Sequence, residues 1–342
     1  MIDIKDIKRR ADIAEAKKNN GQFDMAILDY DEVIRMCEDD SRLWDDLVVC
    51  YVGRAESHLE LKDYSSALND YTAAEDVLRK KFSGNNKQIV DIEMKIARAY
   101  FLDANPAEAI ARYLEAEKQY EEIYGEYNAH SSECYAHIGN IQAKAGKPDK
   151  ACSSYERCIE LLDGAKIGAN LNIVQAKWKC AACYRKCGKS KEEIAKYASA
   201  IKDSIAIQDI ELIAKAYRHL AEAESYNHNL VDAIEAYKQA VDYYAKSGDN
   251  LMIARCYNEI GEIYNSRENT STNKLTAIEY YNSAKDIFMT FGDKFIEEIK
   301  NCYIDIGNIC NKLGRNEDAK HNYELLYVIK RLNFASNINC EE

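Results

Sequence analysis

Three cysteines spaced Cys-x-x-Cys-x-x-x-Cys are the residues of this sequence whose side chains are best suited to binding a metal. Thiolates are ligands that zinc prefers, and Cys180, Cys183 and Cys187 stand close enough to supply half of a site. The same spacing traces one face of a helix, however, and no fourth ligand follows at a suitable distance. We therefore predict that these side chains pack in a core and that the protein binds no metal.

Motifs of catalysis are missing from the sequence. It has no glycine-rich phosphate loop after a strand, no His-Glu-x-x-His and no Gly-x-Ser-x-Gly, and its six histidines are scattered. We expect no catalytic residue, no cofactor and no enzymatic activity.

Residues 144–196 reverse the charge of the chain. They contain twelve basic and six acidic residues, whereas the whole chain has a net charge of −12. Basic side chains beside an aromatic anchor favour an acidic partner, because charge guides the encounter and a ring supplies contact energy. The candidate partner-binding residues are Lys144, Trp178, Lys179, Arg185, Lys186, Lys215, Arg218, Tyr226 and Arg255. The alternative is a solvated helix face on which Trp178 only packs.

Composition narrows the class of partner and the compartment. The sequence pI near 5.2 argues against nucleic acid as the partner, because phosphates are bound by Lys and Arg. No uncharged apolar run approaches the roughly 18 residues that span a bilayer, so we expect no transmembrane segment. The charged start lacks the features of a secretory signal, which predicts a cytoplasmic protein with reduced cysteines.

A tyrosine recurs along the chain and defines the elements that must position these residues. The separations between successive members are 41, 42, 42, 42, 40, 44 and 42 residues. A small residue stands four positions before the tyrosine in seven cases, and Glu193 is the exception. Residues four apart share one helix face, so the small residue admits a neighbouring helix and the ring fills the space beside it. The tyrosines are Tyr30, Tyr71, Tyr113, Tyr155, Tyr197, Tyr237, Tyr281 and Tyr323.

A second small position lies upstream of each tyrosine, and turn residues separate the two. The turns include Asn19-Asn20-Gly21, Asn105-Pro106 and Gly146-Lys147-Pro148. This arrangement predicts two antiparallel helices per period and about eight periods between residues 5 and 330. The second small positions are Ala14, Ala55, Ala97, Gly139, Ala181, Ala221, Gly261 and Gly307.

The repeat resembles the tetratricopeptide repeat family, with a period near 42 where the common form has about 34. The resemblance implies an all-α, right-handed superhelical solenoid that binds proteins on a concave surface formed by the first helix of each pair. It is carried in the fourth period by Tyr135, Ile138, Gly139, Ala151 and Tyr155, in the sixth by Tyr217, Leu220, Ala221, Ala233, Tyr237 and Ala240, and in the seventh by Tyr257, Ile260, Gly261, Tyr264, Ala277, Tyr281 and Ala284.

Two interruptions of the repeat indicate how the array is divided. A glycine-containing joint at 163–168 precedes the degenerate fifth repeat, so we expect repeats one to four in 1–163, repeats five to eight in 164–330 and a C-terminal tail in 331–342. The polar insertion 265–273 in the seventh repeat is expected to form a mobile loop.

A narrower resemblance covers about residues 210–328, where three segments look like the middle of soluble NSF attachment proteins. These segments are 232–244, 253–264 and 277–288. The family implies an adaptor that lays a basic face on an acidic SNARE helical bundle in vesicle fusion. The sequence therefore predicts a non-catalytic scaffold whose groove, with a basic middle, holds an acidic peptide or helical bundle. An attachment-protein-like adaptor and a motor-cargo or cell-polarity adaptor stay open as alternatives.

Overall fold

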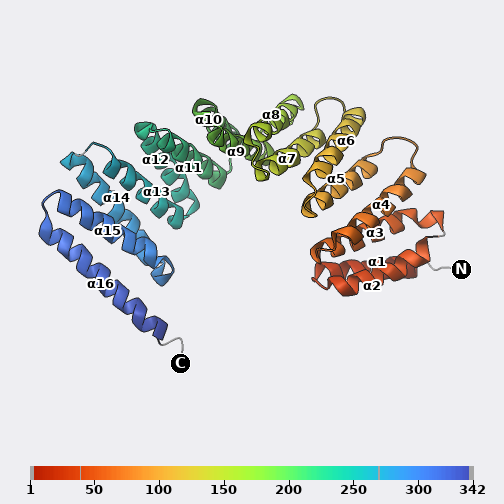
Figure 1. The fold of residues 1–342 in the computed structure, drawn as a ribbon, viewed down its shortest axis with the longest axis horizontal. Coiled ribbons are helices and arrows are strands. Elements are labelled where there is room, and N and C mark those ends of the chain that lie inside the picture. The colour runs from red at the N-terminus through yellow and green to blue at the C-terminus, as the bar shows by residue number, and fades with distance from the viewer. Residues whose placement is uncertain (1–3, 39, 269, 339–342) are drawn as a thin grey trace. The chain divides into compact units, whose positions relative to one another are not determined.

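The computed structural model describes residues 4–38, 40–268 and 270–338, with side chains through residue 328. In these ranges the chain forms sixteen α-helices and two short 3-10 helices (Figure 1). Their bounds are α1 Ile4–Asn19, α2 Phe23–Cys37, η1 Ser41–Leu43, α3 Trp44–Glu60, α4 Tyr64–Lys81, α5 Lys87–Leu102, α6 Pro106–Tyr124, α7 Ala129–Lys144, α8 Pro148–Gly164, α9 Leu171–Lys186, α10 Ser190–Ile207, α11 Ile210–Tyr226, α12 Leu230–Ser247, α13 Asn250–Ser266, α14 Ser271–Thr290, η2 Gly292–Phe295, α15 Ile296–Lys312 and α16 Asn316–Ile338.

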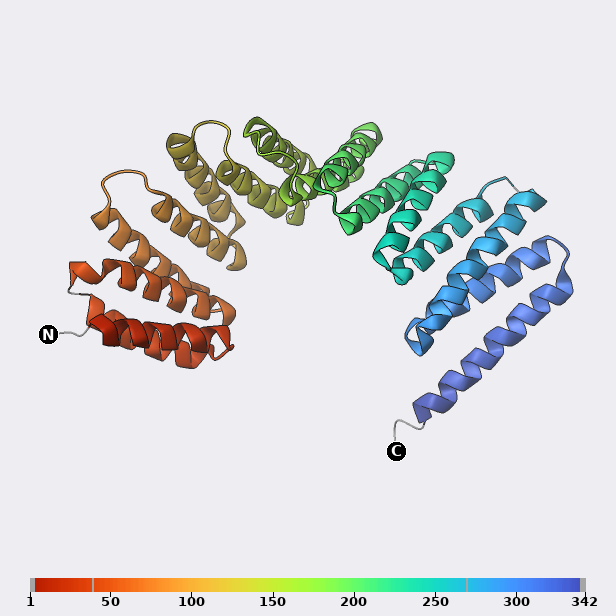
Figure 2. The same cartoon turned by 180° about the vertical axis from the view of Figure 1, so that it is seen from behind.

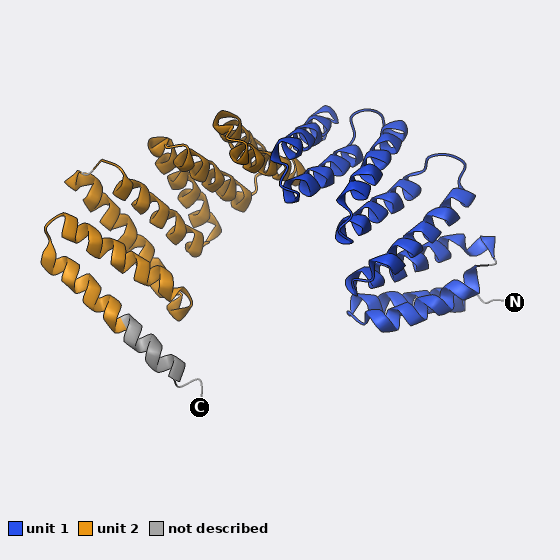
Figure 3. Ribbon diagram, viewed as in Figure 1, with its two compact units in different colours: residues 1–168 blue, residues 169–342 orange. Residues whose placement is uncertain are grey.

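The helices pair in chain order into the eight antiparallel hairpins that the sequence predicts, which confirms the all-α repeat fold (Figures 1 and 2). They fall into two compact units, residues 1–168 and residues 169–342 (Figure 3). Unit 1 contains α1 to α8 and unit 2 contains α9 to α16. The division lies at the end of the glycine-containing stretch 163–168.

The repeat tyrosine is the central packing residue of each hairpin. Seven of the eight are buried, and Tyr323 is partly buried. Tyr155 of α8 lies against Gly139 of α7 so closely that a Cβ added at Gly139 would stand 2.7 Å from the ring. The small residue on the first helix therefore makes room for the ring from the second, as the repeat pattern predicts.

The first helices of repeats three to seven begin with an Asx cap. In each, a side-chain oxygen accepts a hydrogen bond from a backbone N–H of the first turn, at 2.7 to 3.1 Å, which satisfies a donor that the helix itself leaves unpaired. These caps stop each hairpin from continuing into the next and fix where the next helix starts. The capping residues are Asn86, Asn128, Asn170, Asp209 and Asp249.

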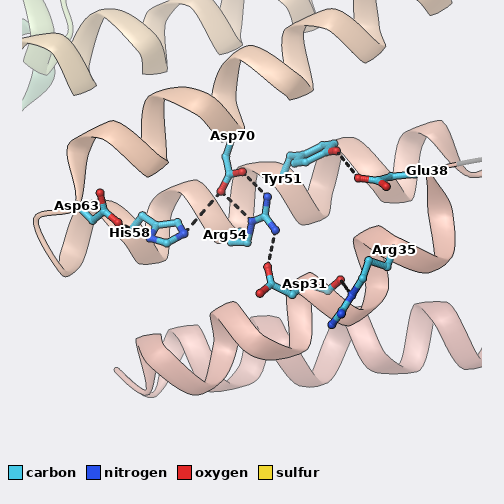
Figure 4. A network of polar contacts seen from close by, with 8 residues as sticks. All are labelled: Asp31, Arg35, Glu38, Tyr51, Arg54, His58, Asp63 and Asp70. Carbon is cyan, nitrogen blue, oxygen red and sulfur yellow. Dashed lines mark hydrogen bonds and ion pairs between the residues drawn. The ribbon is translucent and has the colours of Figure 1, made fainter.

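Arg54 ties three helices of unit 1 together (Figure 4). Its guanidinium on α3 donates to Asp31 of α2 and, through Nε at 2.9 Å, to Asp70 of α4. The Asp70 side chain is 7% exposed, so its charge depends on this bidentate partner. His58 completes the cluster, because its Nε2 lies 3.9 Å from the Asp70 oxygen to which Arg54 Nε donates.

Glu56 forms a second bridge between repeats. Its carboxylate on α3 accepts from Lys18 of α1 and from Lys95 of α5, both at 2.7 Å. The pKa of Glu56 is lowered, because these two lysines outweigh the opposing effect of burial. Ion pairs thus connect the first helices of three successive repeats.

The expectation of a loop over 265–273 is wrong for most of that segment. Residues 265–266 end α13 and residues 271–273 begin α14, so 267–270 alone lie between the helices, and residue 269 is outside the described residues. The Thr270 hydroxyl accepts from the backbone N–H of Asn273 at 3.2 Å and thereby starts α14 early. Lys274 holds the preceding helix end through the Asn265 carbonyl and, at 3.0 Å, its side-chain oxygen.

We predict opposite tolerance for alanine at two glycines of the same repeat position. Gly139→Ala should destabilise the protein by about 1 to 2 kcal/mol, because the clash with the Tyr155 ring exceeds the gain in helix propensity. Gly261→Ala should change stability by less than about 0.5 kcal/mol, since its Cβ would lie 3.0 Å from Tyr281. Chemical unfolding of both variants measures the difference, and equal effects would contradict this account of the packing.

Candidate functional site

A hollow of 570 Å³ lies within unit 2, and we call it the unit 2 hollow. The first helices α11, α13 and α15 supply most of its walls, and aromatic rings from α12 and α14 form its floor. A first-helix lining is what a solenoid of this type presents to a ligand. The lining residues are Lys215, Arg218, Glu222, Tyr237, Tyr244, Asp249, Met252, Arg255, Cys256, Asn258, Glu259, Phe288, Glu298 and Asn301.

Three of the predicted partner-binding residues meet in this hollow. Lys215 donates to Glu211 at 2.5 Å, and Arg218 is paired with Glu222. Arg255 is exposed and has no ion pair among the described residues. Its guanidinium is therefore the one of the three whose charge is open to a partner.

Carboxylates also line the hollow, which residue counting along the chain did not anticipate. Although Glu259 keeps access to water, burial by the surrounding walls and the nearby charges of Glu262 and Glu222 raise its pKa to about 7. Burial and then Asp305 raise the pKa of Glu262, and burial raises that of Asp305. The lining thus contains cations on α11 and α13, Lys215, Arg218 and Arg255, and carboxylates that include Glu259 on α13 and Glu298 on α15.

Arg185 has a structural partner rather than a free charge. Its Nε donates at 2.5 Å to Glu193, whose side chain is 1% exposed, and its guanidinium lies 5.3 Å from the ring of Tyr226. Glu193 is the residue that breaks the small-residue pattern of the repeat. Asn227 approaches the same carboxylate at 3.4 Å, so Arg185 and Asn227 together provide polar partners for the buried Glu193 side chain.

The remaining predicted residues of unit 2 are not part of the hollow. Trp178 is partly buried, packs with Ala181 and Tyr197, and lies 5.1 Å from the ring of His219. Lys179 and Lys186 are exposed on α9, and Tyr226 is 63% exposed at the end of α11. Their part in binding stays a prediction.

Lys144 belongs to unit 1, in a pocket of 350 Å³ that we call the unit 1 pocket. Its ammonium lies 4.9 Å from the centre of the Phe101 ring. The pocket also contains Arg98, which the sequence analysis missed. Arg98 directly follows the small residue Ala97. In other repeats the residue after the small one contacts the repeat tyrosine, so this position in the repeat could have identified Arg98 from the sequence. The lining residues are Arg98, Phe101, Leu102, Tyr113, His137, Asn140, Ile141, Ala143, Lys144 and Tyr155.

The cysteine stripe lies in the helical packing of α9. Cys180 and Cys183 are buried, and Cys187 at the helix end is partly buried. Across the described ranges, no three His, Cys, Asp or Glu side chains are grouped so that they could hold a metal ion. Nor does any helix in those ranges combine the length and apolar character needed to cross a membrane.

Two families match the chain, one in each unit. Residues 88–163 match the tetratricopeptide repeat, and residues 176–331 match the soluble NSF attachment protein, SNAP. Both resemblances expected from the sequence are confirmed, and the second extends further toward the N-terminus than the segments that indicated it. No curated protein matches the chain significantly.

Solved structures resemble the chain at low sequence identity. The C-terminal part of a TPR repeat-containing protein from Cytophaga hutchinsonii has a TM-score of 0.60 at 13% identity, covering 84% of this chain and 99% of that one. A signal transduction ATPase (STAND) protein with a tetratricopeptide repeat sensor from Pyrococcus horikoshii has 0.59 at 15%, covering 93% and 47%. BtubC from P. vanneervenii has 0.52 at 16%, covering 67% and 91%.

The fold is that of a tetratricopeptide-repeat protein. Identities of this size establish the fold alone. Both matched families are, in general, non-catalytic repeat scaffolds. A helical repeat scaffold of this kind fits a protein-interaction adaptor.

We predict that Arg185 stabilises the fifth tetratricopeptide repeat. Arg185→Ala should cost about 3 kcal/mol of unfolding free energy, because it leaves the buried Glu193 carboxylate without its cation. The double variant Arg185→Met, Glu193→Ala restores the usual small residue and should recover most of that loss. Chemical unfolding measures both, and Lys186→Ala on the same helix is the control. A double variant as unstable as Arg185→Ala would contradict this interpretation.

Glu259 should make stability depend on pH. Between its usual pKa of 4.5 and about 7, the folded protein retains a proton that the unfolded chain has released, so stability falls as pH rises through this range. Glu259→Gln removes this penalty. Because the side chain is partly solvated, we expect a gain of about 1 kcal/mol near pH 8 and almost none near pH 5.

Unfolding of wild type and Glu259→Gln at both pH values checks the prediction. Glu279→Gln is the matched control, since Glu279 is exposed on α14 and does not line the hollow. An equal gain at both pH values would show that the effect is not one of titration.

Proposed function

We propose that this protein is a non-catalytic adaptor that holds a partner peptide or helix in the unit 2 hollow. Arg255 supports this most directly, because it is an exposed guanidinium without an ion pair among the described residues, at the edge of a hollow with an aromatic floor. A partner carboxylate would provide that ion pair, and Lys215 and Arg218 would add to the attraction. The carboxylates on α13 and α15 favour a partner that has a basic residue as well as the acidic one.

The predicted set of Lys179, Lys186, Tyr226 and Trp178 extends this proposal along α9 and the end of α11. In it, the exposed lysines guide the encounter with an acidic partner, since long-range attraction acts on the association rate. We also propose that the adaptor acts in the cytoplasm.

A second candidate function is an attachment-protein-like adaptor in SNARE disassembly during vesicle transport. The match of residues 176–331 to soluble NSF attachment proteins favours it. Its ligand would be an acidic helical bundle, whereas the motor-cargo or cell-polarity alternative would have an extended peptide. The type of ligand therefore separates these readings.

Charge reversal in the hollow tests the proposal. Arg255→Glu should weaken partner binding by about tenfold or more, because it removes the unpaired guanidinium and adds a carboxylate that repels the partner carboxylate. Pull-down from cytosolic extract with mass spectrometry identifies the partners, and titration of a purified partner gives the affinity. Lys238→Glu is the control, since Lys238 is exposed on α12 outside the hollow lining.

Partners retained equally by both variants would contradict a binding site in this hollow. A purified four-helix SNARE complex is titrated in parallel. If it binds wild type but not Arg255→Glu, and is released in about 0.5 M salt, the attachment-protein alternative gains support. If it does not bind at all, that alternative is wrong.

A further inference from the structure

The unit 1 pocket belongs to the other compact unit than the hollow of the proposed function, and its lining has a different chemistry. Its lining contains the cations Arg98 and Lys144 and includes no Asp or Glu. This is unusual for its surroundings, because residues 1–168 contain 33 acidic and 23 basic residues. A cationic pocket in an acidic unit focuses the local field on whatever enters it.

Four other cations of unit 1 have carboxylate partners. Lys18 and Lys95 share Glu56, Arg54 has two aspartates, and Arg79 pairs with Glu75 and Glu93. Arg98 has no ion pair or hydrogen bond in the described part of the chain, and Lys144 contacts the Phe101 ring alone. These two positive charges therefore lack the carboxylate partner that those four cations have.

Other groups of the pocket provide a further donor and a wall. Tyr155 donates its hydroxyl hydrogen to Asn140 Oδ1 at 2.9 Å, which fixes the amide so that its Nδ2 donors remain for a ligand. The rings of Tyr113 and His137 stack with centroids 4.9 Å apart and an interplanar angle of 3°. Leu102, which is 40% exposed, provides apolar surface beside them.

We propose that the unit 1 pocket is a second binding site, which takes an aspartate or glutamate side chain of a partner protein together with an adjacent apolar side chain. The carboxylate lies between Arg98 and Lys144 and accepts from Asn140 Nδ2, and the apolar neighbour contacts Leu102 and Phe101. Charge complementarity selects the acidic residue. The volume of 350 Å³ is at the small end for binding pockets, which suits one or two side chains rather than a helix.

The site does not depend on the unit 2 hollow, so one chain can engage two segments. If both segments belong to one partner, the second contact becomes intramolecular and raises the overall affinity without any change in either site. Failure of one site leaves the other intact, which lets the two be tested separately.

Selection from random peptides tests the proposal without a known partner. A phage-displayed library of short random peptides is selected on the full chain, and the recovered peptides are titrated by fluorescence anisotropy. We expect a class with Asp or Glu next to a large apolar residue, whose members bind Arg98→Glu, Lys144→Glu at least about tenfold more weakly. The same peptides should bind Arg255→Glu as they bind wild type.

Two further variants make the result specific. Asn140→Asp keeps the shape of the side chain and can still accept from Tyr155, but it adds a negative charge, so it should also weaken binding of the acidic peptides. Lys118→Glu, Lys150→Glu changes the charge of unit 1 equally at exposed positions outside the pocket lining and should bind as wild type.

Thermal unfolding confirms that each variant is folded. The proposal is overturned if no recovered peptide loses affinity for Arg98→Glu, Lys144→Glu, or if the peptides that do lose affinity contain no acidic residue. Equal weakening by the Lys118 and Lys150 control would also overturn it, because the effect would then be one of net charge.

Discussion

The contact between a tyrosine ring and a small residue of the preceding helix governs the spacing of the helices throughout both units. Because protein interiors are close-packed, the ring and the missing side chain must match in volume, and each hairpin then closes at the same distance. Tyr30 and Tyr323 also direct their hydroxyls to the residue after the small one, Glu15 at 2.7 Å and Asn308 at 2.8 Å. One packing contact thus sets the hairpin and also orients the side chain that follows the small residue.

The fold could be predicted from the sequence because this contact leaves a regular mark of two residue types at fixed spacing. The loop expected over 265–273 could not, because polar composition does not reveal that Thr270 caps a helix and that Lys274 holds the end of the preceding one. Both features act over short distances, yet they depend on hydrogen bonds between particular atoms rather than on periodicity.

The candidate site was predicted only in part, for a physical reason. Counting charges along 144–196 identifies basic residues but not their partners, so Arg185 looked available although Glu193, one turn into the next helix, holds it. The carboxylates Glu259 and Glu298 of the hollow lie on α13 and α15, which are distant in sequence from the basic stretch. Arg98 lies outside the counted stretch, on a helix that folding brings beside Lys144. The charge of a sequence segment does not give the charge of a surface, because each surface of a solenoid collects residues from the same position of several successive repeats.

The Arg54 cluster of Figure 4 bears on how such an array can evolve. Arg54 and Asp70 belong to the second repeat, but Asp31 belongs to the first, and Glu56 reaches into the first and the third. The sequence repeat and the group of helices that ion pairs hold together therefore have different boundaries in this region. Duplication or exchange of the second repeat alone would separate these paired charges, so a gene rearrangement here keeps the pairs only if it carries the flanking helices with it.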